Sequence, residues 1–178
     1  MMIYVPKEDS FLLQRNLKFY VRNKIFLDVG TGSGIQSIEA KKCEAKSILA
    51  LDINEEAIKD LKKQEINTVK SNLFSNIKKE EKFDVIAFNP PYLPRDKRED
   101  KESRKITTGG KRGDEIIVKF LKQAKDHLKK EGVILLVLSS LTPRGNIDSL
   151  LKKQRMSFKV IDEEKLFFEK IQLLEIKT

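Results

Sequence analysis

The 178-residue sequence has little of what disulfide-bonded or metal-binding proteins are built from: one cysteine, one histidine and no tryptophan. Cys43 alone excludes an internal disulfide framework and a cysteine-cluster metal site. With His127 as the single histidine, we expect no metal among the functional residues. No apolar run approaches the roughly 20 residues that cross a bilayer, and MMIYVPKEDS lacks the basic start and apolar middle of a signal peptide. We therefore expect a cytoplasmic protein without membrane contact.

The composition is that of a folded, basic chain. Charged residues make up 35% and hydrophobic residues 39% of the sequence, which excludes extended disorder. The net charge of +9 is compatible with an RNA, DNA or ribosome-associated partner. The lysines are nevertheless spread along helical segments such as FLKQAKDHLKK, as on an ordinary solvated surface. Nucleic acid therefore stays possible as a partner but is not favoured.

Short β-rich runs alternate with helical runs along the chain. We predict helices at 7–20, 33–42, 54–64, 114–130 and 146–154, the third and fourth capped by Asn54 and Asp114. We predict strands at 25–30, 47–53, 66–71, 83–89 and 132–140, and a terminal hairpin of 157–168 with 169–177. This alternation indicates an α/β, doubly wound, mostly parallel seven-stranded sheet of Rossmann-like type, with an antiparallel terminal strand. Without repeats or linkers, residues 1–178 are expected to form a single domain.

A glycine-rich turn follows the strand IFLDV and opens a helix. Ligands of doubly wound sheets bind beyond the carboxyl ends of the strands, near the point where strand order reverses. Gly30 and Gly32 let the backbone turn tightly there and admit a ligand that a β-carbon would exclude. A nucleotide-containing ligand is the functional interpretation, and a purely structural tight turn is the alternative.

Two carboxylates near this turn distinguish between cofactors. Asp52 ends the next strand 22 residues after Gly30, where it can accept hydrogen bonds from ribose hydroxyls. The dinucleotide pattern G-x-G-x-x-G is not met, because its third glycine would fall on Ser37 if counted from Gly32. Asp28 would repel a pyrophosphate but suits the ammonium and sulfonium of S-adenosylmethionine. The pattern therefore favours the methyl donor over NAD.

The strand FDVIAF ends in the corner Asn89-Pro90-Pro91-Tyr92. The prolines fix φ and hold the segment extended. The Asn89 side-chain oxygen and the Pro90 carbonyl can together accept both hydrogens of one planar amide or amine, and Tyr92 offers a face for stacking. Two acceptors raise the electron density of that poorly nucleophilic nitrogen and aim it at a methyl group. The alternative is a double proline that merely terminates the strand.

The motifs together resemble a known family. YVPKEDSFLL, DVGTGSG, LDIN, NLFSNI, FNPPYLP and GGKRGDE, spanning residues 4–115, resemble in this order the HemK-related, class I S-adenosylmethionine-dependent release factor glutamine methyltransferases. The short archaeal and eukaryotic branch, without the N-terminal substrate domain of the bacterial enzymes, is the most similar. The corner alone is shared with adenine methyltransferases, whereas the lead-in with Tyr4, Pro6, Glu8 and Asp9 is more selective.

The resemblance implies roles for individual residues. It implies cofactor contacts at Ser10, Asp28, Gly30, Gly32, Asp52, Asn72 and Leu73, and contacts of Asn89, Pro90, Pro91 and Tyr92 with the target amide. Two positions depart from the family pattern. Ser10 stands where threonine is common, and Asn72 replaces an aspartate that faces the adenine, although its amide oxygen can still accept from the adenine amino group.

The resemblance also implies a substrate and a partner. The expected reaction is methylation of the glutamine side-chain amide in the GGQ motif of a class-1 peptide chain release factor, with a small zinc-binding activator subunit as partner. An adenine amino-group methyltransferase acting on RNA or DNA is the first alternative, and a catalytically silent cofactor-binding subunit is the second. The long charged segment 93–113 orders over substrate, contacts a partner, or is a solvated charge run.

Overall fold

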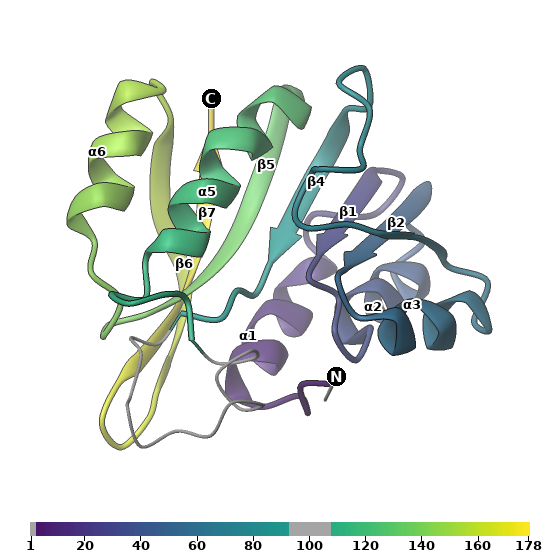
Figure 1. Cartoon of the computed structure of the whole chain (residues 1–178), viewed down its shortest axis with the longest axis horizontal. Helices are drawn as coiled ribbons and strands as arrows, with labels where there is room; N and C mark the ends of the chain where they lie inside the picture. Colours follow the sequence, from purple (N-terminus) through teal and green to yellow (C-terminus); the bar gives the residue numbers. More distant parts are fainter. Residues whose placement is uncertain (1–2, 93–107) are drawn as a thin grey trace.

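The computed structural model describes residues 3–92 and 108–178, which build one seven-stranded sheet with the strand order β3-β2-β1-β4-β5-β7-β6 (Figure 1). The strands are β1 Ile25–Val29, β2 Ser47–Asp52, β3 Asn67–Lys70, β4 Phe83–Phe88, β5 Leu128–Ser139, β6 Ser157–Lys165 and β7 Lys170–Lys177. The helices are α1 Glu8–Leu17, α2 Ile35–Lys42, α3 Glu55–Lys62, α5 Glu115–Ala124 and α6 Gly145–Lys153, with a 3-10 turn, η1, at Lys125–His127.

The predicted mixed topology is confirmed. Strands β3, β2, β1, β4 and β5 pair in parallel, and β7 lies antiparallel between β5 and β6. The antiparallel strand is thus second from the edge, and β6 forms the edge itself. None of the helices built by residues 3–92 and 108–178 is long and apolar enough to cross a membrane.

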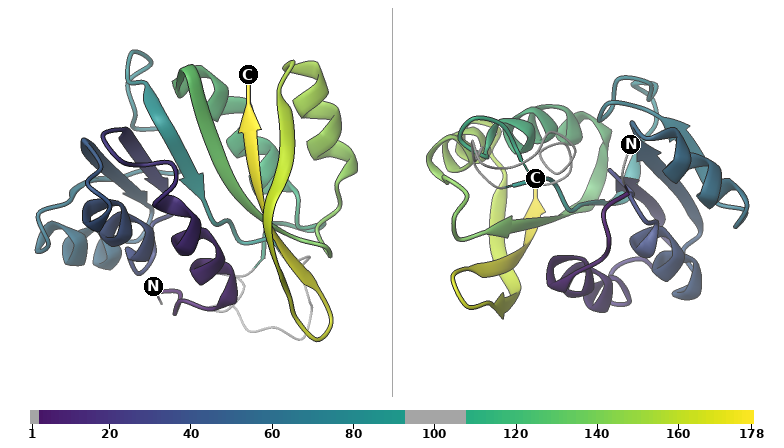
Figure 2. Two further views of the ribbon diagram at one scale, coloured as in Figure 1. Left: turned by 180° about the vertical axis from the view of Figure 1, so that it is seen from behind. Right: turned by 60° about the horizontal axis from the view of Figure 1, so that its bottom comes forward.

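Helices pack on both faces of the sheet (Figures 1 and 2), because side chains alternate between the two faces along each buried strand. In β4, Val85 and Ala87 belong to the cluster formed with the α1 leucines, whereas Ile86 and Phe88 belong to the cluster formed with α5 and α6. Successive residues of a strand point to opposite faces, so one strand supplies both cores. Helices α1, α2 and α3 cover one face, and α5 and α6 cover the other.

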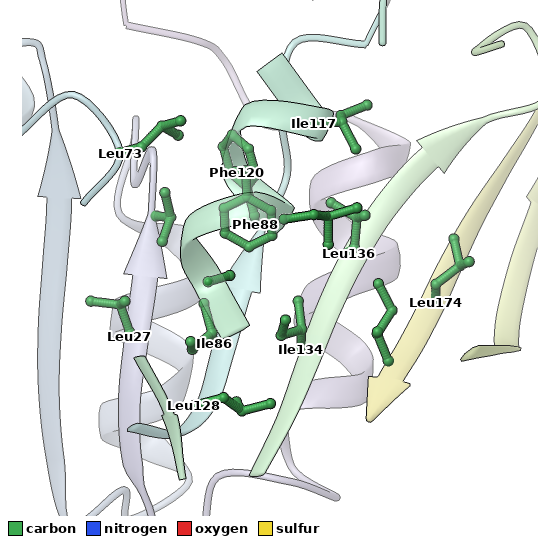
Figure 3. Packing of buried hydrophobic residues seen from close by; sticks show 14 of the residues in the cluster. Leu27, Leu73, Ile86, Phe88, Ile117, Phe120, Leu128, Ile134, Leu136 and Leu174 are labelled. Atoms are coloured by element: carbon green, nitrogen blue, oxygen red, sulfur yellow. The ribbon is translucent and has the colours of Figure 1, made fainter. Parts of the chain in front are cut away.

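A group of aromatic rings fixes α5 against the sheet (Figure 3). The Phe120 side chain is fully buried, and its ring centroid lies 4.6 Å from that of Phe88 and 5.8 Å from that of Phe74. Burial of one such side chain contributes about 1.5–3 kcal/mol. Because Phe88 is the last residue of β4, this packing holds the start of the Asn89 corner rigidly in place.

Several predicted boundaries were wrong in detail. The first helix ends at Leu17 and not at residue 20, and β6 ends at Lys165 and not at residue 168. The helix expected to continue to residue 130 ends at Ala124, and β5 begins at Leu128, which pairs with Phe83. Pairing with β4 resumes at Val133, which lies opposite Val85, so the charged residues 129–131 lie in an irregularity of the strand pair and not in a helix. Asp114 occupies the N-cap position of α5 without capping it, because its carboxylate accepts from Arg112 and Asn146 instead. The Asn54 cap is confirmed, with its Oδ1 accepting from the backbone of α3.

The strand order reverses between β1 and β4. Val29 at the end of β1 pairs with Leu51 in β2 and with Phe88 at the end of β4. The carboxyl ends of these strands therefore meet at one edge of the sheet, which is the edge where doubly wound folds bind their ligands.

Candidate active site

A pocket of about 460 Å³ opens at this edge. It is lined by every residue to which the sequence analysis gave a role: Ser10, Asp28, Gly30, Gly32, Asp52, Asn72, Leu73, Asn89, Pro90, Pro91 and Tyr92. The glycine turn comes from the end of β1, Asp52 from the end of β2 and the proline corner from the end of β4. Residues that are distant in sequence thus share one cavity because parallel strands end together.

The glycine turn combines two different requirements. Gly30, Gly32 and Gly34 have φ values of 64°, 52° and 80°, a region that favours glycine. A β-carbon on Gly34 would lie 2.3 Å from Leu61 Cδ2, so packing of α2 on α3 explains that glycine. A β-carbon on Gly32 would meet nothing nearer than the Gly30 carbonyl at 3.9 Å. Gly32 therefore leaves room that the protein itself does not fill.

The Asp28 carboxylate accepts hydrogen bonds from residues of the glycine turn and of the helix that follows it. Its Oδ2 accepts from the Thr31 hydroxyl at 2.6 Å, the Ser37 hydroxyl at 2.7 Å and the Ser37 amide at 3.1 Å. Burial raises the pKa of Asp28 to about 6, against the lowering effect of the Thr31 and Ser37 hydrogen bonds and with a further rise from nearby Asp52. A cationic ligand in the pocket would offset this cost of a buried negative charge.

Asp52 connects the end of β2 to the glycine turn. Its Oδ2 accepts from the Gly32 amide at 2.8 Å, and its Oδ1 accepts from the Asn54 amide at 2.8 Å. Each carboxylate oxygen has lone-pair capacity beyond one bond. Asp52 is thereby fixed in orientation and can still accept from a pair of ribose hydroxyls.

Sequence reasoning missed two features of the cofactor side of the pocket. Gln36 lines it, is 4% exposed and donates to the Ser10 carbonyl at 2.9 Å, while its Oε1 is buried with no partner among residues 3–92 and 108–178. Leu73 has a φ of 54°, a left-handed conformation that costs roughly 1–2 kcal/mol for such a residue. The Ser71 hydroxyl supports it by donating to the Leu73 carbonyl at 2.7 Å. The sequence indicates neither feature: the direction of Gln36 depends on how α2 packs beside Ser10, and a positive φ is uncommon for leucine.

The Asn89 amide is oriented from α1. Its Nδ2 donates to the Ser10 hydroxyl oxygen at 3.4 Å, and the Ser10 hydroxyl donates to Asp9 Oδ1 at 3.2 Å. Because Ser10 uses its hydrogen on Asp9, it offers only lone pairs to Asn89. The Asn89 Oδ1 is left buried and has no hydrogen-bond partner in the part of the chain that the structure describes. An unsatisfied buried acceptor costs about 1–3 kcal/mol, which a ligand N–H would recover.

The Tyr92 hydroxyl makes a hydrogen bond that the sequence analysis missed. Its hydroxyl donates to Asp9 Oδ2 at 3.2 Å, and the Tyr4 hydroxyl donates to the same oxygen at 3.1 Å. Burial, followed by the negative charge of Asp9, raises the pKa of both tyrosines far above their ordinary value. Both hydroxyls therefore stay protonated and donate to Asp9, which fixes the position of the Tyr92 ring.

The family model for the methyltransferase small domain matches residues 8–168. The chain belongs to the methyltransferase small domain family. This methyltransferase is 42% identical over 166 residues to a Methanocaldococcus jannaschii protein provisionally named a protein N5-glutamine methyltransferase, covering 89% of this chain and 82% of the relative. It is 28% identical over 183 residues to the eRF1 methyltransferase catalytic subunit mtq2 of Schizosaccharomyces pombe, covering 85% and 78%. Against the release factor glutamine methyltransferase of Fusobacterium nucleatum, it is 35% identical over 108 residues, which are 54% of this chain and 30% of that protein.

Solved structures show the same fold. The methyltransferase of the E. cuniculi Mtq2-Trm112 complex, described as responsible for methylation of the eRF1 termination factor, superposes with a TM-score of 0.80 at 24% identity and covers 100% of this chain and 99% of its own. The T. thermophilus 16S rRNA N2 G1207 methyltransferase, in complex with AdoMet and guanosine, has a TM-score of 0.69 at 19% identity, covering 98% and 44%. At these identities the likeness concerns the fold.

The remaining predicted features of this methyltransferase lie around the pocket. Residues 93–107 of the charged segment 93–113 lie outside the described residues. Gly109, in the glycine pair that follows, packs against the corner, since a β-carbon there would lie 2.6 Å from the Pro91 carbonyl oxygen. Among residues 3–92 and 108–178, no group of three or more His, Cys, Asp or Glu side chains is arranged to hold a metal ion.

Proposed function

We propose that this protein transfers a methyl group from S-adenosylmethionine to the side-chain amide nitrogen of the glutamine in the GGQ motif of a class-1 peptide chain release factor. One observation carries the proposal: the buried Oδ1 of Asn89, which has no hydrogen-bond partner among residues 3–92 and 108–178, belongs to the same pocket as the glycine turn and its two aspartates. A planar NH₂ group offered to that oxygen would lie in the cavity that suits the methyl donor.

The residues on the β1 and β2 side fit the cofactor. Gly32 leaves open space that a β-carbon would fill, and the buried Gln36 Oε1 accepts no hydrogen bond within the described part of the chain, so it can accept one from a ligand. Asp28 suits a cationic group, and Asp52 suits the ribose hydroxyls, with Ser10, Gly30, Asn72 and Leu73 as further contacts. When bound, S-adenosylmethionine supplies an electrophilic methyl group on a sulfonium. These residues would hold its charged and polar parts.

The corner residues position the target amide. Asn89 Oδ1 and the Pro90 carbonyl accept its two hydrogens, Pro91 keeps the segment extended, and the Tyr92 ring lies against its plane. Acceptance of both hydrogens increases the electron density on nitrogen and directs its lone pair away from the acceptors. Positioning replaces a strong general base, because the nitrogen becomes acidic only as its new bond forms.

The names of the relatives support a protein substrate. The M. jannaschii and S. pombe relatives are covered over 82% and 78% of their lengths and are named for glutamine and eRF1 methylation. By analogy with the E. cuniculi complex, we propose a small zinc-binding activator subunit as partner. We further propose that residues 1–178 act as a single domain and that the enzyme works in the cytoplasm, where release factors act.

A rival function is methylation of an adenine amino group in RNA or DNA. The net charge of +9 favours it, and adenine presents the same planar NH₂ group to the corner. A competition assay separates the two functions. The enzyme, alone and co-expressed with the activator subunit, is incubated with radiolabelled S-adenosylmethionine and either purified release factor or total RNA and DNA. Label in the release factor supports the proposal, whereas label confined to nucleic acid overturns it.

A further inference from the structure

The tip of the β6–β7 hairpin exposes two aromatic side chains. Phe167 and Phe168 are 92% and 86% exposed, and their rings pack edge to face with centroids 4.7 Å apart. A backbone hydrogen bond from the Leu166 amide to the Glu169 carbonyl, 2.8 Å long, closes the turn beneath them. Exposure of two adjacent phenyl rings to water is energetically unfavourable. Exposed apolar groups of this kind often mark sites of interaction with another molecule.

This tip is continuous with the active-site pocket. Leu166, Glu169 and Ile171, which flank the two rings in sequence, all line the pocket. Figures 1 and 2 show the hairpin projecting past the edge of the sheet at which β1 and β4 end. Any molecule that inserts one group into the pocket while its bulk stays outside would meet Phe167 and Phe168 at the rim.

Side-chain contacts connect the hairpin to α1 and to β5. Arg15 of α1 forms ion pairs of 2.8 Å with both Asp162 and Glu164 of β6. At the tip, next to the two rings, the Glu169 carboxylate accepts from the hydroxyl of Ser139 at the end of β5. A phenylalanine side chain has only two rotatable bonds, so it loses little conformational entropy on binding, which is a property of aromatic anchor residues at protein interfaces.

The charge of the hairpin distinguishes between kinds of partner. Residues 162–170, DEEKLFFEK, carry four acidic and two basic side chains, a net charge of −2 in a chain whose total is +9. Even with Arg15 included, the hairpin end is not positive. A nucleic-acid phosphate backbone would gain no attraction here, although exposed aromatic rings alone could stack on bases. An apolar protein surface flanked by basic side chains complements both the rings and the acids.

We propose that Phe167 and Phe168 dock against the body of the protein substrate, on an apolar patch flanked by basic side chains beside the loop that carries the target glutamine. The inference rests on the proposed function and adds the element that grips the substrate. A GGQ loop is small and offers few side chains to hold, so affinity must come from contacts outside the pocket.

A matched pair of variants tests the docking role. The double variant Phe167→Ser, Phe168→Ser removes both rings, while Phe19→Ser removes a ring that is 72% exposed just beyond the carboxyl end of α1, outside the pocket lining. All three residues are exposed, so circular dichroism and thermal unfolding should match the wild type. For each protein, in the enzyme form that is active, three quantities are measured: steady-state methylation of intact release factor, and binding of release factor and of labelled RNA to the enzyme saturated with S-adenosylhomocysteine.

The proposal predicts that the double variant raises KM and Kd for release factor by about tenfold or more, with kcat changed less than about threefold, while Phe19→Ser behaves as wild type. Unchanged KM and Kd in the double variant overturn it. An equal loss in both variants also overturns it, as does a loss confined to binding of labelled RNA. If the wild type does not methylate release factor at all, the proposed function fails. If the wild type does so and the double variant does so equally well, only the docking role fails.

Discussion

Tyr92 and Asp9 are 83 residues apart in sequence, yet the Tyr92 hydroxyl donates a 3.2 Å hydrogen bond to Asp9 Oδ2. The other carboxylate oxygen of Asp9 accepts a hydrogen bond from the Ser10 hydroxyl. The Ser10 hydroxyl oxygen in turn accepts a hydrogen bond from the Asn89 side-chain amide. One buried carboxylate therefore fixes both the ring and the amide of the corner. Asp9 is a positioning residue in this arrangement, since it acts through Ser10 and Tyr92.

Replacement of Asp9 should impair the chemical step more than cofactor binding. In Asp9→Asn, the carboxamide can donate to Ser10, which would free the Ser10 hydroxyl hydrogen and favour a flipped Asn89 amide. Small displacements of reacting groups cost up to about a hundredfold in rate. We expect kcat to fall about ten- to hundredfold and the Kd for S-adenosylhomocysteine, measured by calorimetry, to change less than about threefold.

Glu175→Gln is the matched control for Asp9→Asn. Glu175 is also a buried carboxylate, 6% exposed, and accepts from the Tyr20 hydroxyl at 2.8 Å, but it does not line the pocket. It should lose stability without a selective fall in kcat. If both variants lose activity in proportion to their loss of stability, Asp9 has only a structural role.

Substitutions at Gly32 and Gly34 should separate an effect on cofactor binding from an effect on folding stability. In Gly32→Ala, the new methyl group would enter the open part of the pocket, so we expect weakened binding of S-adenosylhomocysteine and a folding cost of only about 1–2 kcal/mol from the left-handed backbone. In Gly34→Ala, the methyl group would overlap Leu61 at 2.3 Å, so the loss of stability should be larger. Calorimetric titration and urea unfolding measure the two effects. Equal stability losses in the two variants would contradict this division.

Asp28 should make folding stability depend on pH. Its pKa of about 6 in the folded protein exceeds its value in the unfolded chain, about 3.9. The folded state therefore binds a proton that the unfolded state releases, and the resulting stabilisation is complete below about pH 4 and lost as pH rises through 6. The difference in unfolding free energy between wild type and Asp28→Asn should shift against the wild type by roughly 2 kcal/mol from pH 4 to pH 7. A constant difference across urea titrations at these pH values would refute the prediction.

The same carboxyl group should tie cofactor binding to pH. A cation stabilises the charged form of Asp28, so affinity for S-adenosylmethionine should rise with pH until about pH 6, by up to about tenfold per unit, and then level off. Calorimetric Kd values between pH 5 and pH 8 test this dependence. In Asp28→Asn the affinity should be lower and nearly independent of pH; a wild-type pH profile in that variant would mean that another group controls binding.

The sequence was sufficient for the parts of the site that follow from local rules. The glycine turn, the strand ends and the proline corner are each recognisable from a few consecutive residues. The pairing of parallel strands then brings these segments together at one edge of the sheet. The sequence was insufficient where side chains from separate elements meet. The direction of Gln36 depends on the packing of α2, the anchor of Tyr92 depends on α1, and the start of β5 at Leu128 depends on pairing with β4. The left-handed conformation of Leu73 is a different case, since the supporting Ser71 hydroxyl is two residues away, but such a φ is uncommon for leucine and the sequence does not predict it.

The central claim is that Asn89 presents its side-chain oxygen to a planar NH₂ group of the substrate. Tandem mass spectrometry of release factor treated with wild-type enzyme and with Asn89→Ala tests it most directly, with calorimetry to verify that the variant still binds S-adenosylhomocysteine. We predict one methyl group on the glutamine side chain of the GGQ peptide with the wild type, and at least about a hundredfold less with the variant. Methylation of another residue, or an unchanged yield with Asn89→Ala, would contradict the account.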